Sequence, residues 1–243
     1  MRTAAALVIG NELLSGKIQD QNVMVLARAL RAIGVQFRRV VMVLDELDTI
    51  AAEVKDLSRT HDVVFTSGGV GPTHDDVTID AVAKAFGVDT VYSNEIDDML
   101  RAYYGERITP GHLAMAKVPR GSRLSRAKGE VWPAIIKENV WVLPGVPQIF
   151  AMKMSLVQEE LKGDAGWISL AVHTTLDEGN LKDHLDRVVA AYPQVDIGSY
   201  PTWDNTGYRT KLTFDGLDAS AVERARDAFL AYLAPEVIVA LDK

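Results

Sequence analysis

Short apolar runs alternate with stretches in which apolar residues recur every three or four positions along the first two thirds of the chain. The runs at Ala4–Ile9, 35–44 and 61–65 have the length of strands buried in a parallel sheet. The stretches between them, 23–30 and 47–57, have the spacing of amphipathic helices. Alternation of strand and helix predicts a three-layer α/β domain with a largely parallel sheet over residues 1–162.

The pattern changes near Gly163–Gly166, a polar stretch that we interpret as a domain boundary. Beyond it, the sequence predicts strands and helices in the order β-α-β-β-α-β. This is the order of a ferredoxin-like unit, so we expect a smaller α+β domain over residues 166–243. Its predicted elements are strands at 168–174, 195–200, 208–214 and 237–241 and helices at 181–191 and 221–233.

Composition excludes several kinds of site. The 243 residues contain no cysteine, which excludes disulfides, zinc–thiolate sites and thiol nucleophiles. The formal net charge of −7 argues against a general nucleic-acid binder. The apolar run at Ala4–Ile9 is far too short to cross a membrane. We therefore expect a cytoplasmic protein that binds neither nucleic acid nor membrane.

One segment, Thr66–Thr78, organises the first domain. It follows an apolar strand, contains Gly68, Gly69 and Gly71, and precedes apolar residues with helical spacing. Glycine permits a positive φ and a close approach of a ligand to the main chain. A helix N-terminus beyond the glycines would offer unpaired amides to a phosphate. The segment therefore predicts a phosphate-binding turn.

Two carboxylates in this segment, Asp75 and Asp76, allow two interpretations. Thr73 and Asp76 have the spacing of a capping box, which would make Asp76 a helix cap. Alternatively, Asp75 and Asp76 hold a divalent metal beside the phosphate, for which their hard oxygen ligands favour Mg²⁺ or Mn²⁺. We favour the metal site, because a capped turn alone would not require three glycines and a proline upstream.

The residues Gly68–Thr78 also resemble the signature of the molybdopterin-binding (MoaB/Mog-like) domains, found in CinA and in eukaryotic FAD synthase. Ile9–Leu14 and Asp20–Asn22 are similar to the first motif of that family, although Asn11 stands where the family usually has an acid. The loop Leu143–Pro147 is similar to one that flanks the family's pocket. The substrate-binding residues that this resemblance implies are Gly10, Asn11, Glu12, Asn22, Ser67, Gly68, Gly69, Gly71, Thr73, Pro144 and Gly145.

Two further acids, Asp45 and Glu12, each allow two interpretations. From spacing alone, Asp45 is an N-cap of the following helix, and Glu12 is either a ligand or a solvated loop acid. In the resembled family an acid at the position of Asp45 lines the active site. The resemblance therefore implies a catalytic set of Asp45, Asp75 and Asp76.

Outside the signature, residues 121–133 differ most from CinA, which leaves the choice of substrate open. Arg120, Arg123, Arg126 and Lys128 form a basic cluster that either holds a phosphate or is a solvated face. Near the C-terminus, residues 197–203 resemble the stretch that follows the molybdopterin-binding domain of FAD synthase. Tyr200 and Trp203 in that stretch either stack on a ring or, more typically, pack in the core.

The function that this resemblance implies is a metal-dependent nucleotide pyrophosphatase acting on FAD, ADP-ribose or a related dinucleotide. The first alternative is a molybdopterin-binding or adenylylating domain of molybdenum cofactor biosynthesis, and the second is a non-catalytic nucleotide-binding module. In each case the expected partner is a nucleotide or pterin phosphate, and we expect the chain to form a homo-oligomer.

Overall fold

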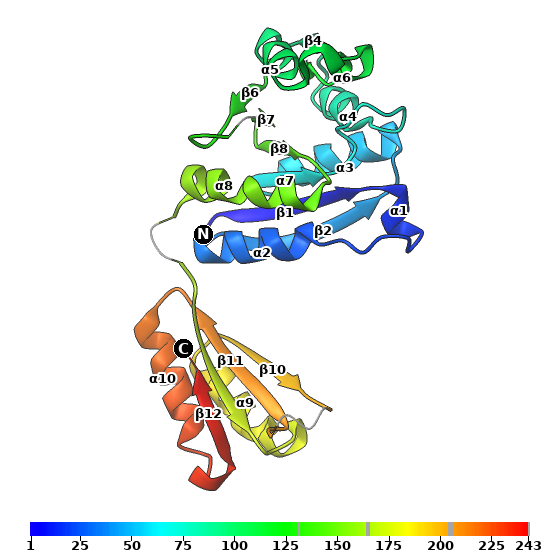
Figure 1. The fold of residues 1–243 in the computed structure, drawn as a ribbon. Coiled ribbons are helices and arrows are strands. Elements are labelled where there is room, and N and C mark those ends of the chain that lie inside the picture. The colour runs from blue at the N-terminus through cyan, green and yellow to red at the C-terminus, as the bar shows by residue number, and fades with distance from the viewer. Residues whose placement is uncertain (131, 164–165, 204–206, 243) are drawn as a thin grey trace. The chain divides into compact units, whose positions relative to one another are not determined.

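The computed structural model describes residues 1–130, 132–163, 166–203 and 207–242. The chain forms two compact units, Met1–Asp164 and Ala165–Lys243, called here the N-terminal and C-terminal units (Figure 1). The boundary predicted at 163–166 includes residues 164 and 165, which lie outside the described residues. Among the described residues no helix is both long and apolar enough to cross a membrane.

The elements of both units follow the order expected from the sequence. The N-terminal unit contains β1 (Thr3–Ile9), α1 (Asn11–Leu14), α2 (Asn22–Ala32), β2 (Gln36–Val43), α3 (Leu47–Thr60), β3 (Val63–Ser67), α4 (Thr78–Ala85), β4 (Thr90–Tyr92), α5 (Asn94–Tyr104), the 3₁₀ helix η1 (Gly105–Arg107), α6 (Pro110–Ala114), β5 (Lys117–Pro119), β6 (Arg123–Ser125), β7 (Ala134–Lys137), β8 (Val140–Leu143), α7 (Pro147–Met152) and α8 (Met154–Leu161). The C-terminal unit contains β9 (Ile168–Thr174), α9 (Glu178–Ala191), β10 (Asp196–Pro201), β11 (Thr210–Gly216), α10 (Ala219–Leu230), the 3₁₀ helix η2 (Pro235–Val237) and β12 (Ile238–Asp242).

The N-terminal unit is built on a six-stranded sheet with the order β2-β1-β3-β8-β7-β6. The first four strands are parallel, while β7 and β6 are antiparallel to their neighbours. Strands β7 and β8 form a hairpin that turns at Glu138–Asn139, where Glu138 takes a φ of 52°. The predicted α/β fold with a largely parallel sheet is confirmed.

Helices cover both faces of this sheet, which makes three layers (Figure 1). Successive residues of β1 point to opposite faces, as the pleat of a strand requires. Ala4 and Ala6 pack with Phe65 against α2, α7 and α8, whereas Ala5 and Leu7 pack against α3 and α4. With both faces covered, the ends of the strands and their loops are left to form a site.

A small substructure, here called the α5–β5 segment (residues 94–119), has a hydrophobic cluster of its own. Ile96, Leu100, Ala116 and Val118 are buried in it. Thr109 caps α6, with proline at the first helical position. In Figure 1 this segment lies beyond α4 at the far side of the unit from α2. It supplies one wall of the pocket described below.

The C-terminal unit is an antiparallel four-stranded sheet with the order β10-β11-β9-β12. Its core contains Phe214 and Phe229, packed between the sheet and helices α9 and α10. This is the predicted ferredoxin-like arrangement. The expectation of core packing for two aromatic residues is wrong, because Tyr200 is 56 % exposed and Trp203 is 98 % exposed.

We expect a truncated chain that ends at Lys162 to fold by itself, since the buried clusters of the two units share no residue. It should be soluble and unfold in one cooperative transition, measured by circular dichroism during thermal or urea unfolding. A truncated chain that is insoluble, or that unfolds without cooperativity, would show that the N-terminal unit depends on the rest of the chain.

Candidate functional site

A pocket of about 830 Å³ opens at the carboxyl ends of β1, β2, β3 and β8. This is the edge at which parallel α/β sheets place their ligands. Of the residues predicted to bind substrate or metal, those that line it are Gly10, Glu12, Asn22, Asp45, Ser67, Gly68, Gly69, Gly71, Thr73, Asp75, Asp76, Pro144 and Gly145. Asn11 does not line the pocket and has a different role, given below.

The side chain of Asn22 joins three of the loops that form the pocket. It is 3 % exposed at the start of α2. Its Nδ2 donates to Ser67 Oγ over 2.8 Å and to the carbonyl oxygen of Gly145 over 2.9 Å. Hydrogen bonds from one buried amide therefore fix the ends of β3 and β8 relative to α2.

The glycines of the turn are required first by the packing of the protein itself. Gly68 has a φ of +109°, and a Cβ there would lie 2.2 Å from the carbonyl oxygen of Ile9. Gly69 has a φ of +64°, and its Cβ would lie 2.3 Å from Thr78 Oγ1. A Cβ on Gly145 would lie 3.2 Å from the Cα of Gly68. The evidence for a ligand therefore comes from the backbone amides and not from the glycines as such.

Three consecutive amides of this turn are open. Within the described parts of the chain, the N–H groups of Gly69, Val70 and Gly71 have no acceptor. By contrast, the N–H of Thr78, the first of α4, donates to the carbonyl oxygen of Gly69. The phosphate-binding potential thus lies in the loop amides, and the first amide of the helix is used to hold the loop.

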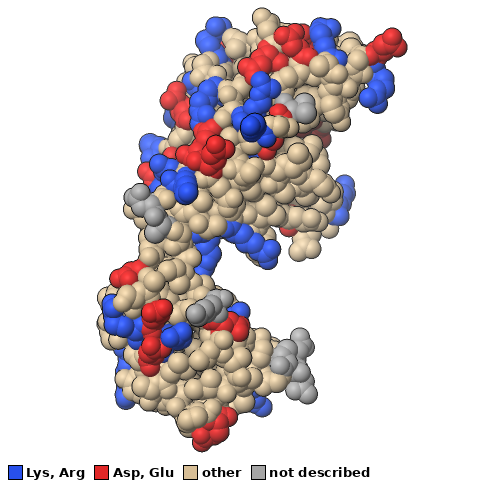
Figure 2. All heavy atoms as spheres, turned by 60° about the vertical axis from the view of Figure 1, so that its left-hand side comes forward, with Lys and Arg blue, Asp and Glu red and all other residues tan. Residues whose placement is uncertain are grey.

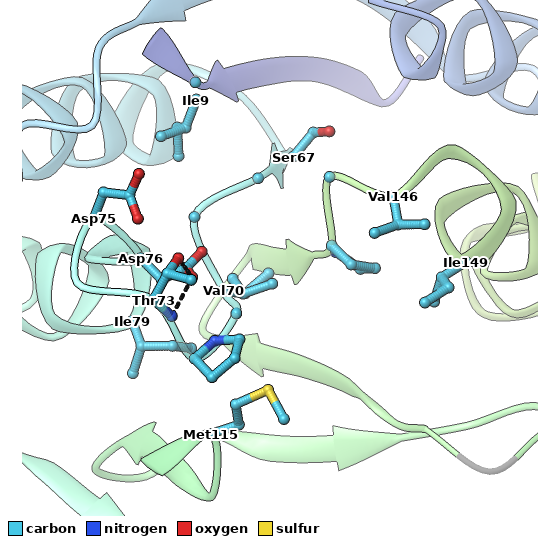
Figure 3. A pocket seen from close by; sticks show the side chains of 18 of the residues that line it. Ile9, Ser67, Val70, Thr73, Asp75, Asp76, Ile79, Met115, Val146 and Ile149 are labelled. Carbon is cyan, nitrogen blue, oxygen red and sulfur yellow. Dashed lines mark hydrogen bonds between the residues drawn. The ribbon is translucent and has the colours of Figure 1, made fainter. Parts of the chain in front are cut away.

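The capping interpretation of Asp76 is wrong. Helix α4 begins at Thr78, with Val77 as an N-cap that makes no side-chain cap. Asp76 Oδ2 instead accepts hydrogen bonds from the N–H and the hydroxyl of Thr73, the N–H at 2.8 Å (Figure 3). Thr73 and Asp76 therefore close a loop ahead of the helix. Thr73 N–H is consequently occupied, which removes it from the predicted phosphate-binding amides.

Asp45 likewise does not cap its helix, because α3 begins after Glu46 and has no side-chain cap. Asp45 Oδ2 accepts from the N–H of Asn11 at 2.8 Å, and Asn11 Oδ1 accepts from the N–H of Asp45 at 3.3 Å. Asn11 thus positions Asp45 at the pocket instead of contacting a ligand there.

Four carboxylates share the polar side of the pocket. Burial raises the pKa of Asp45 above its ordinary value. The hydrogen bond from the Asn11 amide lowers this pKa, and the nearby charges of Glu12, Asp75 and Asp76 raise it further. The pKa of Asp75 is lowered, mainly by a hydrogen bond from Thr73. An array of like charges of this kind attracts a cation.

Among the described residues, no three or more carboxylate or histidine side chains are arranged as a ready-made metal site. The donor set nonetheless fits a hard cation, since Mg²⁺ characteristically uses one or two carboxylates and completes its shell with water and substrate phosphate. Asp75 and Asp76 would supply the two carboxylates. The side chain of His74 is 98 % exposed, and its Nδ1 lies 4.0 Å from Asp75 Oδ1. We therefore do not include His74 among the metal ligands.

The other side of the pocket is apolar and was not predicted from the sequence. Val146 and Ile149 lie across the pocket from Asp75, and Met115 lies below the glycine turn (Figure 3). The α5–β5 segment contributes further apolar and aromatic lining residues, joined by Trp132. The periodicity of apolar residues in α5 was the sequence signal that could have indicated this apolar wall. Periodicity shows that a helix has an apolar face, but it does not show what that face packs against.

The basic cluster proposed from the sequence does not reach the pocket. Arg120 pairs with Asp89, Arg123 with Glu160 and Arg126 with Glu95. None of these three arginines, nor Lys128, lines the pocket. Basic and acidic side chains are interspersed over the face that Figure 2 shows. The three arginines therefore belong to surface ion pairs.

Residues 5–162 match the family model described as the probable molybdopterin binding domain, and residues 167–242 match the middle domain of FAD synthase. The chain belongs to the molybdopterin-binding family. This confirms the resemblance seen in the signature and in the residues around Tyr200.

The relatives of this chain differ in length. The chain is 31 % identical to a probable FAD synthase of Caenorhabditis briggsae over 98 % of its own length and 50 % of the relative's, so it spans about half of that protein. It is 34 % identical to a protein of Archaeoglobus fulgidus over 91 % of this chain and 93 % of the relative. The crystal structure of CinA, of unknown function, from Thermoplasma acidophilum matches 67 % of this chain and all of its own, with a TM-score of 0.61 and 30 % identity.

We expect Asn22→Ala to destabilise this member of the molybdopterin-binding family by about 1–3 kcal/mol, because buried partners on Ser67 and Gly145 lose their hydrogen bonds. Urea unfolding measures the change. Met24→Ala is the control on the same helix, since Met24 is 59 % exposed and its loss should cost less than about 0.5 kcal/mol. Equal stability of the two variants would contradict the role given to Asn22.

Proposed function

We propose that this chain is a metal-dependent nucleotide pyrophosphatase that hydrolyses FAD, ADP-ribose or a related dinucleotide. The observation that carries the proposal is the shared lining of one pocket by the open amides of Gly69–Gly71 and by the carboxylates of Asp45, Asp75 and Asp76. The match of residues 167–242 to the middle domain of FAD synthase supports a nucleotide as the substrate.

Charge balance is the reason for including a metal. A pyrophosphate carries negative charge, and six acidic side chains, including the four described above, line the same pocket against two lysines, one of which, Lys153, is paired with Glu130. At short range such like charges repel strongly in a partly desolvated site. A divalent cation held by Asp75 and Asp76 would replace this repulsion by attraction. When bound, it would also neutralise charge on the leaving phosphate and lower the pKa of the attacking water.

The residues of the chain then have separate roles. The amides of Gly69, Val70 and Gly71 donate to the oxygens of one phosphate, and the Thr73–Asp76 contact keeps that loop closed. Water attacks the phosphorus, the bridging P–O bond breaks, and two monophosphates leave. Asp45, with its raised pKa, is the group that we assign to accept the proton of the water.

A second candidate is supported by the family match itself. The probable molybdopterin binding domain covers residues 5–162, and the same three amides would hold the phosphate of a pterin. Calorimetry with FAD, ADP-ribose and a pterin monophosphate separates the two candidates. Tighter binding of the pterin, without release of AMP from either dinucleotide, would favour the second.

We expect Asp76→Asn to lower kcat for Mg²⁺- or Mn²⁺-dependent hydrolysis of the dinucleotide by about a thousandfold, because the charge that holds the cation is lost. The Asn side-chain oxygen still accepts from Thr73, so the melting temperature should stay near that of the wild type. Release of AMP from FAD and from ADP-ribose measures the rate.

Asp48→Asn is the matched control, because Asp48 pairs with Lys84 and does not line the pocket. It should hydrolyse at the wild-type rate. If Asp76→Asn also hydrolysed both dinucleotides at that rate, Asp76 would be only the residue that closes the loop.

A further inference from the structure

The apolar side of the pocket is much larger than a phosphate requires. The cavity of about 830 Å³ is continuous from the carboxylates to the aromatic residues of the α5–β5 segment. Pockets of this size bind whole small molecules, mainly through apolar and aromatic walls with a few polar groups. A ligand fixed by its phosphate at Gly69–Gly71 therefore has its remaining part directed along this wall.

The wall contains two aromatic side chains placed for ring contacts. Tyr103 and Trp132 meet edge to face, with ring centroids 5.1 Å apart. Tyr103 is 56 % exposed although it lines a pocket. Tyr104, the next lining residue, is stacked on His112. An exposed aromatic surface in a cavity favours a flat ring as its partner.

A buried ion pair fixes the segment that carries Trp132. Lys153 Nζ lies 2.6 Å from Glu130 Oε2, with the two side chains 3 % and 11 % exposed. The same Nζ donates to the carbonyl oxygen of Trp132. A buried charge needs such partners, so Lys153, which directly follows α7, holds both the Glu130 carboxylate and the backbone carbonyl of Trp132. Lys153 therefore acts as a positioning residue for Trp132.

We infer that Trp132, held by Lys153 and Glu130, is the residue that selects ligands carrying a flat heteroaromatic ring, which it binds together with Tyr103. The inference rests on the proposed function for the place of the phosphate and deepens it by naming the other half of the ligand. The ring is that of a flavin or an adenine, and the binding measurements described next distinguish the two.

The test measures binding and not hydrolysis, so that it is independent of the proposed activity. Calorimetry on the full chain with Mg²⁺ present compares FMN, AMP and inorganic pyrophosphate, which has no ring. We expect Trp132→Ala to weaken the binding of FMN or AMP by about tenfold or more, because an aromatic stacking partner is lost. The affinity for pyrophosphate should change by less than about twofold. The mononucleotide whose affinity falls in this variant identifies the ring.

Two control variants test whether the effect is due to the aromatic ring of Trp132. Trp132→Phe keeps an aromatic face and should restore most of the affinity. Trp203→Ala removes a tryptophan that is 98 % exposed in the other unit and should change nothing. The inference is overturned if Trp132→Ala leaves both mononucleotides unchanged, or if it weakens pyrophosphate as much as the ring ligands.

The positioning role is tested by a double-mutant cycle. Lys153→Met together with Glu130→Gln removes both charges at once, which avoids leaving one of them unpaired in the interior. This pair of changes should weaken the ring ligand in the wild-type background and have no further effect in the Trp132→Ala background. Equal effects in the two backgrounds would show that the ion pair acts on the fold and not through Trp132.

If the chain hydrolyses dinucleotides but Trp132→Ala binds FMN and AMP normally, the proposed function stands and this inference fails. If no hydrolysis occurs but the ring ligands depend on Trp132, the inference stands as a property of a binding module.

Discussion

The buried amide of Asn22 is the contact on which the geometry of the pocket depends. Its two hydrogen bonds join the ends of β3 and β8 to α2. At the same point a Cβ on Gly145 would lie 3.2 Å from the Cα of Gly68, and a Cβ on Gly68 would lie 2.2 Å from the carbonyl oxygen of Ile9. Since these loops supply both the open amides and part of the apolar wall, a shift in this contact would move both ends of the site.

The second constraint is electrostatic. Glu12, Asp45, Asp75 and Asp76 come from three different strand ends. Burial raises the pKa of Asp45, and the charges of the other three acids raise it further. Such an arrangement is unfavourable for folding unless something offsets the repulsion, and it is characteristic of functional sites. The divalent cation that we propose, shared with a phosphate, would offset it and would account for open amides and acids lining one cavity.

Much of this architecture follows from the sequence, for identifiable reasons. The strand predicted at 168–174 is β9 as observed, because continuous apolar runs bounded by polar residues allow few other structures. The capping alternative for Asp76 was wrong, since the spacing of Thr73 and Asp76 fits a capping box and a closed loop equally well. Trp203 was expected inside, because composition favours burial of tryptophan, but its neighbours leave it in solvent. The role of Trp132 could not be predicted, because it depends on how α5, α7 and the preceding loop meet in three dimensions.

We propose that the glycine turn and the two aspartates form one site for a phosphate and a cation. A crystal structure with Mn²⁺ and a non-hydrolysable pyrophosphate analogue of FAD or ADP-ribose tests it most directly, since the anomalous signal locates the metal independently. The account predicts a phosphate on the amides of Gly69, Val70 and Gly71 and an anomalous peak between that phosphate and the carboxylates of Asp75 and Asp76. A phosphate bound elsewhere, or a metal bound away from both aspartates, would contradict it.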